Sequence, residues 1–286
     1  MSQENRPPEP LAGFVTVNGL SLRYLDWGGA GAPIVIVHAT GFLGYVYRPI
    51  AGALRSLGHV FSYDQRGHGE SAQPPLDEID WYRSADDLEG FITAMGFERV
   101  RAFGHSAGGT AIAAVAARRP ELIERAVLVE PVLIDANDPR ERPSELFERT
   151  LKRKRVFESL DAMYDNFADK PPFATWKREV LRDFCLHGTQ EDADGRRLLR
   201  CPPEIEARIY QTARDFDGLG RLLSSTVPIL VVFGERSDSP GIGFASRIAD
   251  GAPHRQVRIL PGASHFAPME YPEEVAQIAA AFFQAG

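Results

Sequence analysis

The chain has 286 residues, of which 44% are hydrophobic, and a formal net charge of −7. An acidic chain gains no electrostatic attraction to phosphates, which argues against nucleic acid or an anionic membrane surface as its main partner. The longest apolar stretches, residues 111–117 and 278–283, are too short to span a bilayer. The polar, proline-rich start does not resemble a signal peptide, so we expect a cytoplasmic protein, monomeric or homodimeric.

The first predicted element is a hairpin, because Asn18-Gly19 separates two alternating segments, residues 14–17 and 21–26. Short apolar runs then predict strands buried on both faces. They lie at residues 34–37, 59–63, 100–103, 126–129, 229–233 and 257–260. Helical patterns lie between them, one starting at Ser84 and ending at Gly96 and another starting at Pro272. This alternation predicts an α/β fold with a mostly parallel sheet and helices on both faces.

Residues 134–225 interrupt this alternation. They contain no convincing buried strand, and a helical pattern opens at Ser144. We expect a helical cap inserted into a core made of residues 1–133 and 226–286. Residues 152–155, Lys-Arg-Lys-Arg, span a full helical turn and not one face, so we interpret them as a solvated part of this cap and not as a nucleic-acid patch.

The strongest chemical signal is Gly104-His105-Ser106-Ala107-Gly108, between the predicted strand at 100–103 and a helical pattern at 110–117. Such a tight turn exposes the serine hydroxyl at the carboxyl edge of the sheet, and the glycines relieve the crowding that the turn creates. The following helix directs its N-terminal N–H groups at the serine, where they can stabilise negative charge. We therefore expect Ser106 to be a nucleophile.

A nucleophilic serine needs a base and an acid. Of the seven histidines, His265 is the best base, because it follows the last predicted strand and lies on the same sheet edge as Ser106. Asp238, on the loop after residues 229–233, can reach the far nitrogen of His265, and we favour it as the acid. Glu130, at the end of the strand at 126–129, is the alternative.

Further candidates surround this site. The backbone of Ala107 supplies one oxyanion donor by its position, and Phe42, in the small-residue loop 38–44, is our choice for the second. The loop of residues 64–71 carries tempting charges, to which we assign a structural role. With two cysteines and no metal-binding spacing, we expect neither metal nor cofactor. Aromatic residues of the cap are candidates to line an apolar substrate pocket with Phe42: Phe167, Phe173, Trp176 and Tyr210.

These motifs resemble those of capped α/β-hydrolase-fold serine hydrolases, which include esterases, lipases and carbon–carbon bond hydrolases. The matching segments are 38–44, 64–71, 104–108 and 262–265, the last together with Glu270 and Pro272, within flanks at roughly 14–131 and 226–286. The resemblance implies a triad of Ser106, Asp238 and His265, with Phe42 and Ala107 as the oxyanion hole. The chain departs from the pattern in two places. Ser237 stands where the acid motif has Asp, with Asp238 one residue further on. The oxyanion loop usually reads His-Gly, whereas here Ala39-Thr40 intervene before Gly41-Phe42.

The resemblance implies a carboxylesterase-like hydrolase that acts through an acyl-enzyme on a carboxylic ester or a related small apolar acyl substrate. Epoxide hydrolases and haloalkane dehalogenases of similar fold use an aspartate, because they form an alkyl-enzyme ester, so a serine argues for acyl transfer. Two alternatives stay open. One is a carbon–carbon bond hydrolase acting on ketones or diketones, or a lactonase, with the same triad. The other is a ligand-binding receptor with residual hydrolase activity.

Overall fold

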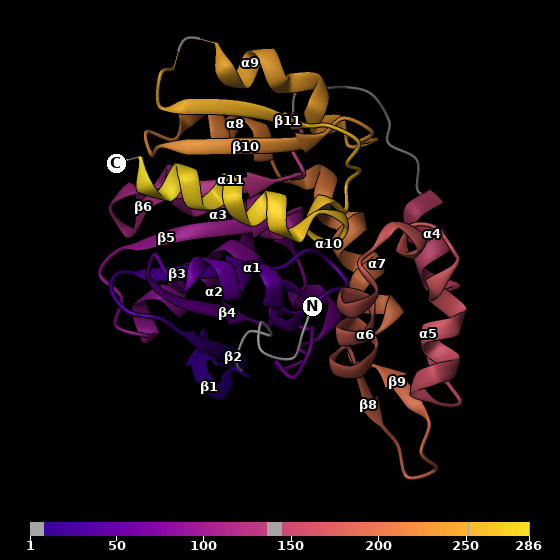
Figure 1. Cartoon of the computed structure of the whole chain (residues 1–286). Helices are drawn as coiled ribbons and strands as arrows, with labels where there is room; N and C mark the ends of the chain where they lie inside the picture. Colours follow the sequence, from indigo (N-terminus) through magenta and orange to yellow (C-terminus); the bar gives the residue numbers. More distant parts are fainter. Residues whose placement is uncertain (1–8, 136–144, 251, 286) are drawn as a thin grey trace.

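The computed structural model describes residues 9–135, 145–250 and 252–285. An eight-stranded sheet runs through the molecule in the order β1-β2-β4-β3-β5-β6-β10-β11 (Figure 1). Its strands are β1 (Leu11–Val17), β2 (Leu20–Gly28), β3 (Pro33–Val37), β4 (His59–Tyr63), β5 (Val100–His105), β6 (Ile123–Val129), β10 (Ile229–Gly234) and β11 (Arg255–Leu260). The pairs from β4 to β11 are parallel, while β1–β2 and β2–β4 are antiparallel. The predicted mostly parallel α/β sheet is confirmed.

The hairpin at the start forms where the sequence predicts it. β1 and β2 pair in antiparallel register, with Val17 opposite Leu20. Asn18 and Gly19 both have positive φ, 49° and 80°, as a two-residue turn of the mirror-image type requires.

Helices cover both faces of the sheet. They are α1 (Arg48–Leu54), α2 (Trp81–Ala94), α3 (Ala107–Arg118), α9 (Ala245–Ala249), α10 (Ala267–Glu270) and α11 (Pro272–Gln284). On β3, Ile34 and Ile36 join the buried cluster of α1 and α11, whereas Val35 and Val37 join that of α2 and α3. Alternate side chains of one strand thus fill two separate cores. Helix α11, yellow in Figure 1, starts at Pro272 as predicted.

Two helix starts differ from the predictions. Helix α2 begins after Asp80, whose side chain accepts the N–H of Arg83, and not at Ser84. Helix α1 was not predicted, since its seven residues are too few to show a helical repeat of apolar positions.

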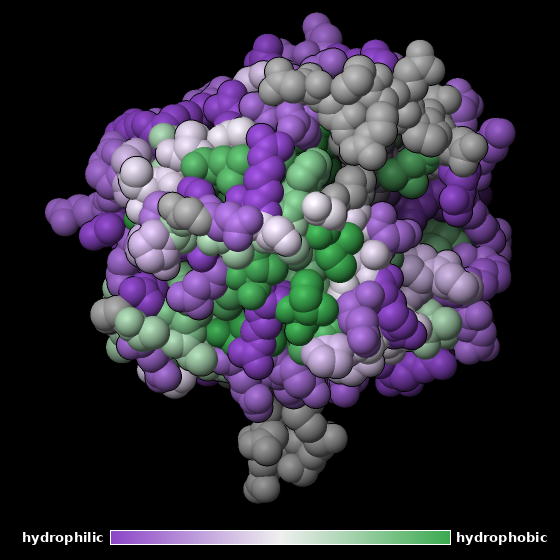
Figure 2. All heavy atoms as spheres, turned by 90° about the horizontal axis from the view of Figure 1, so that it is seen from above, coloured by the Kyte–Doolittle hydropathy of each residue, from purple (hydrophilic) through white to green (hydrophobic). Residues whose placement is uncertain are grey.

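Figure 2 shows the face of the molecule that lies at the top of Figure 1. On this face, hydrophilic side chains surround a smaller group of hydrophobic ones.

The segment between β6 and β10 contains more than helices. Its helices are α4 (Glu145–Leu151), α5 (Leu160–Ala168), α6 (Arg178–His187), α7 (Pro203–Thr212) and α8 (Gly218–Ser224). A small sheet of order β7-β9-β8 joins them, built from β7 (Val156–Phe157), β8 (Thr189–Glu191) and β9 (Arg197–Leu199). The expectation of a purely helical segment is therefore wrong, because strands of two or three residues are too short to show periodicity. The predicted opening at Ser144 lies outside the described residues.

Two further details correct the prediction for this segment. Residues 152–155 do not lie on a helix, because α4 ends at Leu151. Arg153, in that run, pairs with the buried carboxylate of Glu206 on α7. Helix α8 packs against α3 and so belongs with the helices that cover the main sheet. We call the part from α4 to α7 the inserted segment.

The inserted segment is attached to the core by a buried ion pair and by aromatic rings. The guanidinium of Arg48 on α1 contacts the carboxylate of Asp183 on α6 at 2.7 and 2.8 Å, and both side chains are about 5% exposed. Phe42 packs edge-on against Trp176 and Phe184 of the inserted segment, with ring centroids 5.1 and 5.8 Å apart. These contacts fix the inserted segment beside the carboxyl ends of the strands, on the right of Figure 1.

Candidate active site

Ser106 stands on the turn between β5 and α3, as the sequence predicts. Its φ of 51° and ψ of −118° are unusual for a residue with a side chain and mark a strained turn. The flanking glycines are required by close packing. A Cβ on Gly104 would lie 2.6 Å from the backbone nitrogen of Gly109, and one on Gly108 would lie 2.2 Å from the carbonyl oxygen of Val37. The spacing of the motif therefore follows from how closely α3 approaches β3 and β5.

The imidazole of His265 lies beside this serine. Its Nε2 is 3.1 Å from Ser106 Oγ, although the two residues are 159 positions apart in the chain. His265 lies on the loop between β11 and α10, which meets the Ser106 turn at the carboxyl edge of the parallel strands. The structure thus brings together the predicted nucleophile and base.

The acid in contact with His265 is Glu130, which corrects our preference for Asp238. Oε2 of Glu130 is 3.2 Å from Nδ1 of His265, and the glutamate side chain is fully buried. Asp238 is exposed, and within the described residues its carboxylate forms no hydrogen bond or ion pair with the imidazole. Its position on the loop after β10 brings it to the edge of the neighbouring cavity instead.

The sheet register explains why Glu130 reaches His265. The N–H of Ser106 donates to the carbonyl of Val129, and the N–H of Glu130 donates to Val232, so the glutamate follows β6 between β5 and β10. Its φ of 52° turns the chain sharply at that point. The carboxylate then accepts the N–H of Gly234 at 2.6 Å and the hydroxyl of Ser237 at 2.6 Å. Ser237, which stands where the family motif has an acid, thus donates a hydrogen bond to the acid on the neighbouring strand.

The oxyanion loop has most of its N–H groups occupied. Ala39 donates to Tyr47 Oη at 3.1 Å, and Gly41 donates to His68 Nε2 at 3.0 Å. Phe42 donates to the carbonyl of Ala39 at 3.1 Å, so its N–H is not free to bind an oxyanion. This corrects the choice of Phe42 as the second donor. Among the described residues, the N–H of Thr40 has no acceptor, and Thr40 borders the same cavity as Ser106.

Two buried histidines hold this loop. His38 Nε2 accepts the N–H of Gln65 while its Nδ1 donates to the carbonyl of Ala39. His68 accepts from Gly41 and donates from Nδ1 to the carbonyl of Arg66. Burial lowers the pKa of His38 to about 4 and that of His68 to about 3, so both rings are neutral at pH 7 and can accept these bonds.

The loop of residues 64–71 supports the oxyanion loop, and none of its residues lines the cavity that Ser106 borders. Asp64 accepts the N–H of Gly44 at 2.8 Å and that of Glu70 at 3.1 Å. Arg66 forms a two-pronged pair with the buried carboxylate of Asp87, at 2.6 and 2.7 Å. These contacts agree with the structural role that the sequence analysis assigns to this loop.

A cavity of about 660 Å³ opens beside Ser106 and His265. Of the aromatic residues proposed from the sequence, Phe42 and Tyr210 line it. Phe167 and Phe173 line a separate cavity of about 80 Å³ on the other side of Phe42. Trp176 is 3% exposed and packs between Phe42 and Phe173, so it holds the inserted segment to the core.

Sequence reasoning missed most of the residues around the larger cavity. They include Thr40, Trp81, Val132, Ile134, Leu146, Phe147, Gln211 and Phe266. Only Val132 and Ile134 could have been found from the sequence, because they follow the strand β6, which ends beside Ser106 at the carboxyl edge of the sheet. Charged side chains at the cavity, Glu148, Arg214 and Asp238, are all exposed.

Within the described ranges, no group of three or more His, Cys, Asp or Glu side chains is arranged to hold a metal ion. No helix in those same ranges is long and apolar enough to cross a membrane.

Several known proteins are similar to this chain. The 2-(acetamidomethylene)succinate hydrolase of Mesorhizobium japonicum is 26% identical over 250 residues, which cover 86% of this chain and 85% of that protein. Epoxide hydrolase A of Mycobacterium tuberculosis is 38% identical over 107 residues, which cover 36% of this chain and 33% of that protein. The crystal structure of E-2-(acetamidomethylene)succinate hydrolase superposes with a TM-score of 0.82 at 23% identity, over 96% of this chain and 100% of that one.

The strongest assignment comes from a family model. The model of the alpha/beta hydrolase family matches residues 34–278, which include the sheet from β3 onward, the inserted segment and the Ser106–His265 site. A match of this extent covers well over half of the chain. The protein therefore belongs to the alpha/beta hydrolase family of hydrolases.

Proposed function

We propose that this protein is a serine hydrolase that cleaves small apolar acyl substrates, with carboxylic esters as the main class, through an acyl-enzyme. The observation that carries the proposal is the series of contacts from Ser106 Oγ to His265 Nε2 at 3.1 Å and from His265 Nδ1 to Glu130 at 3.2 Å. A serine next to a histidine that is oriented by a buried carboxylate is the arrangement that acyl transfer needs.

In the proposed reaction, Ser106 Oγ attacks the substrate carbonyl while His265 Nε2 accepts its proton. Glu130 holds the imidazole with Nδ1 protonated and stabilises the positive charge that it gains. His265 then protonates the leaving alcohol, and a water molecule activated by the same histidine releases the acid. This cycle needs no metal or cofactor.

The developing oxyanion would be bound by the backbone N–H groups of Ala107 and Thr40. Ala107 is the first residue of α3, so its N–H has no partner within the helix and the helix dipole adds to its field. Of the oxyanion-loop residues that line the cavity, Ala39 and Phe42 have their N–H groups occupied by the bonds described above, whereas that of Thr40 has no acceptor among the described residues. Two such donors contribute several kcal/mol to the stability of a tetrahedral intermediate, roughly 3–4 kcal/mol each.

The cavity supports an apolar, uncharged substrate. Its walls are made mostly of apolar side chains, among them Trp81, Val132, Ile134 and Phe266. Its charged residues are exposed, and Arg214 lies 3.7 Å from Asp215, so its charge is partly balanced. Tyr210 on α7 and Phe147 on α4 also line the cavity, so the inserted segment acts as the cap over the site in this proposal.

A serine nucleophile also separates this proposal from epoxide hydrolysis, although some similar proteins are named epoxide hydrolases. Others are named as a bifunctional esterase/perhydrolase and as an N-formylmaleamate deformylase. A serine that attacks a carbonyl gives an acyl-enzyme, which water can hydrolyse.

The proposal is tested with p-nitrophenyl esters of increasing acyl length, together with lactones, a vinylogous diketone and an epoxide. We expect turnover of short and medium esters by the parent protein and a loss of about 10⁴-fold or more in Ser106→Ala. Turnover of the diketone or the epoxide with none of the esters would contradict the ester assignment.

The oxyanion donors are tested by the crystal structure of a phosphonate adduct of Ser106. The phosphonyl oxygen should lie about 2.7–3.1 Å from the backbone nitrogens of Thr40 and Ala107. An adduct in which that oxygen contacts the nitrogen of Phe42 instead would refute the assignment of Thr40.

A further inference from the structure

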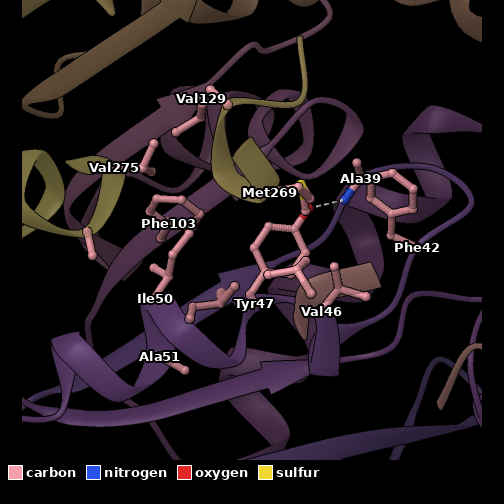
Figure 3. Close-up of a cluster of buried hydrophobic side chains, with 14 of the residues drawn as sticks. Ala39, Phe42, Val46, Tyr47, Ile50, Ala51, Phe103, Val129, Met269 and Val275 are labelled. Atoms are coloured by element: carbon pink, nitrogen blue, oxygen red, sulfur yellow. Dashed lines mark hydrogen bonds between the residues drawn. The ribbon is translucent and has the colours of Figure 1, made fainter. Parts of the chain in front are cut away.

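A buried chain of hydrogen bonds joins the three segments that hold the reacting groups. It starts at the N–H of Ala39 in the oxyanion loop, which contacts Tyr47 Oη at 3.1 Å (Figure 3). Tyr47 Oη lies 2.7 Å from Nδ1 of His105, the residue before Ser106. His105 Nε2 lies 2.8 Å from the carbonyl oxygen of His265. The chain thus contacts Ala39, which precedes Thr40, and His105, which precedes Ser106. Its last member is the backbone of the proposed base, His265.

The direction of every proton in this chain follows from its last member. The carbonyl of His265 can only accept, so His105 must carry its proton on Nε2. In a neutral ring Nδ1 is then an acceptor, and Tyr47 must donate its hydroxyl proton to it. The oxygen of Tyr47 is left to accept the N–H of Ala39, which can only donate. All three bonds are therefore satisfied by one arrangement of protons.

The surroundings hold both groups in the required protonation state. His105 is fully buried, and burial lowers its pKa to about 3, so its ring is neutral across the physiological range. Burial also raises the pKa of Tyr47 well above its usual value, and its side chain is 1% exposed. Figure 3 shows Tyr47 packed among apolar side chains, which include Val46, Ile50 and Phe103.

We propose that Tyr47 and His105 are positioning residues that set the distances between the oxyanion loop, Ser106 and His265. The inference rests on the proposed function, because it assigns these three segments to one reaction. Neither residue lines the cavity beside Ser106, so both act through the backbone of the reacting groups. Tyr47 holds Ala39, which precedes the proposed donor Thr40, and His105 holds the backbone of the proposed base.

Loss of the Tyr47 hydroxyl would disturb both ends of the chain. The N–H of Ala39 would lose its acceptor, and His105 Nδ1 would lose the donor that, together with the carbonyl of His265, holds the ring in its tautomer. A ring protonated on Nδ1 would direct a lone pair at the carbonyl of His265, which would repel it. Displacements of about 1 Å between reacting groups cost on the order of 10²-fold in rate.

The test compares two tyrosine variants. Tyr47→Phe should lower kcat for p-nitrophenyl esters by roughly 10- to 100-fold while KM changes less than about threefold, since the cavity is untouched. Tyr63→Phe is the matched control, because Tyr63 is also fully buried but its hydroxyl has no hydrogen-bond partner among the described residues. The control should keep its kcat. A kcat of Tyr47→Phe within threefold of the parent would overturn the proposal.

A second pair of variants keeps the test valid if Tyr47→Phe folds poorly. His105→Gln retains a donor for the carbonyl of His265 and an acceptor for Tyr47, whereas His105→Leu has a similar size and neither group. We expect Gln to exceed Leu in kcat by about tenfold or more. Equal values, or a higher value for Leu, would mean that the site requires only volume and would overturn the proposal.

A measurement independent of activity tests the proton arrangement itself. The imidazole ¹⁵N chemical shifts of labelled protein should show that Nε2 of His105 is protonated and that Nδ1 is not. We expect this in both the parent protein and Tyr63→Phe. The opposite tautomer in the parent would overturn the chain of bonds described above. Absence of any ester turnover by the parent, with the expected tautomer present, would instead count against the proposed function and leave the hydrogen-bond chain established.

Discussion

Replacement of Glu130 by Gln tests the role of the buried acid most sharply. Gln has nearly the same shape, and its oxygen can still accept the N–H of Gly234. It carries no charge, however, and with its oxygen on Gly234 its NH2 group would stand where Oε2 of Glu130 stands and face both the hydroxyl of Ser237 and Nδ1 of His265. Both of these groups donate to that oxygen in the parent protein. The variant therefore removes the charge and disfavours the productive tautomer while it keeps the packing.

The size of the effect follows from the distance between the two groups. In the transition state the imidazole gains a full positive charge 3.2 Å from the carboxylate. With an effective dielectric constant of about 20, two unit charges at that separation attract each other by about 5 kcal/mol. Since each 1.4 kcal/mol corresponds to a factor of ten, kcat should fall by about 10³- to 10⁴-fold.

Steady-state hydrolysis of a p-nitrophenyl ester that the parent turns over measures this change, with circular dichroism to verify folding. The matched control is Asp238→Asn, which alters an exposed carboxylate at the cavity edge and should change kcat by less than about threefold. Should Glu130→Gln keep more than a tenth of the activity while Asp238→Asn loses it, the assignment of the acid would be refuted.

The remaining predictions concern stability and specificity. The three buried neutral histidines have folded pKa values of about 3 to 4 against 6.5 when unfolded, so stability should fall as pH decreases from about 6.5 toward 4. Each contributes a slope of about 1.4 kcal/mol per pH unit, measurable by urea unfolding at several pH values, and a flat profile would contradict their neutral burial. Asp87→Asn removes the carboxylate that pairs with the buried guanidinium of Arg66. The free energy of unfolding should fall by about 3–5 kcal/mol, with little change in kcat. A fall below about 1 kcal/mol would contradict the importance of this ion pair. Phe42→Ala removes the ring between the cavities of about 660 and 80 Å³. The ratio of kcat/KM for long acyl chains to that for short ones should rise by about tenfold. An unchanged ratio would show that the two cavities stay separate.

The sequence could predict the sheet and the Ser106–His265 pair because their signals are local. A run such as residues 34–37 reads as a buried strand on its own, and the glycines around Ser106 report a tight turn without knowledge of its neighbours. The carboxyl ends of parallel strands share one edge, so placing Ser106 and His265 after such strands was enough to bring them together.

The acid and the oxyanion donor could not be predicted in the same way. The choice between Glu130 and Asp238 depends on the pairing of β6 with β10 and on the positive φ of Glu130, neither of which is written in a local pattern. The choice of donor depends on which N–H groups already have partners. The acceptor of Gly41 is 27 residues away in the chain, so a count of free donors requires the tertiary structure.

The most direct test of the central claim is stoichiometric labelling with a fluorophosphonate followed by peptide mapping. The account predicts one covalent adduct per chain, located on Ser106, and no adduct in Ser106→Ala. An adduct on another residue, or equal labelling of the Ser106→Ala variant, would contradict the assignment of Ser106 as the nucleophile.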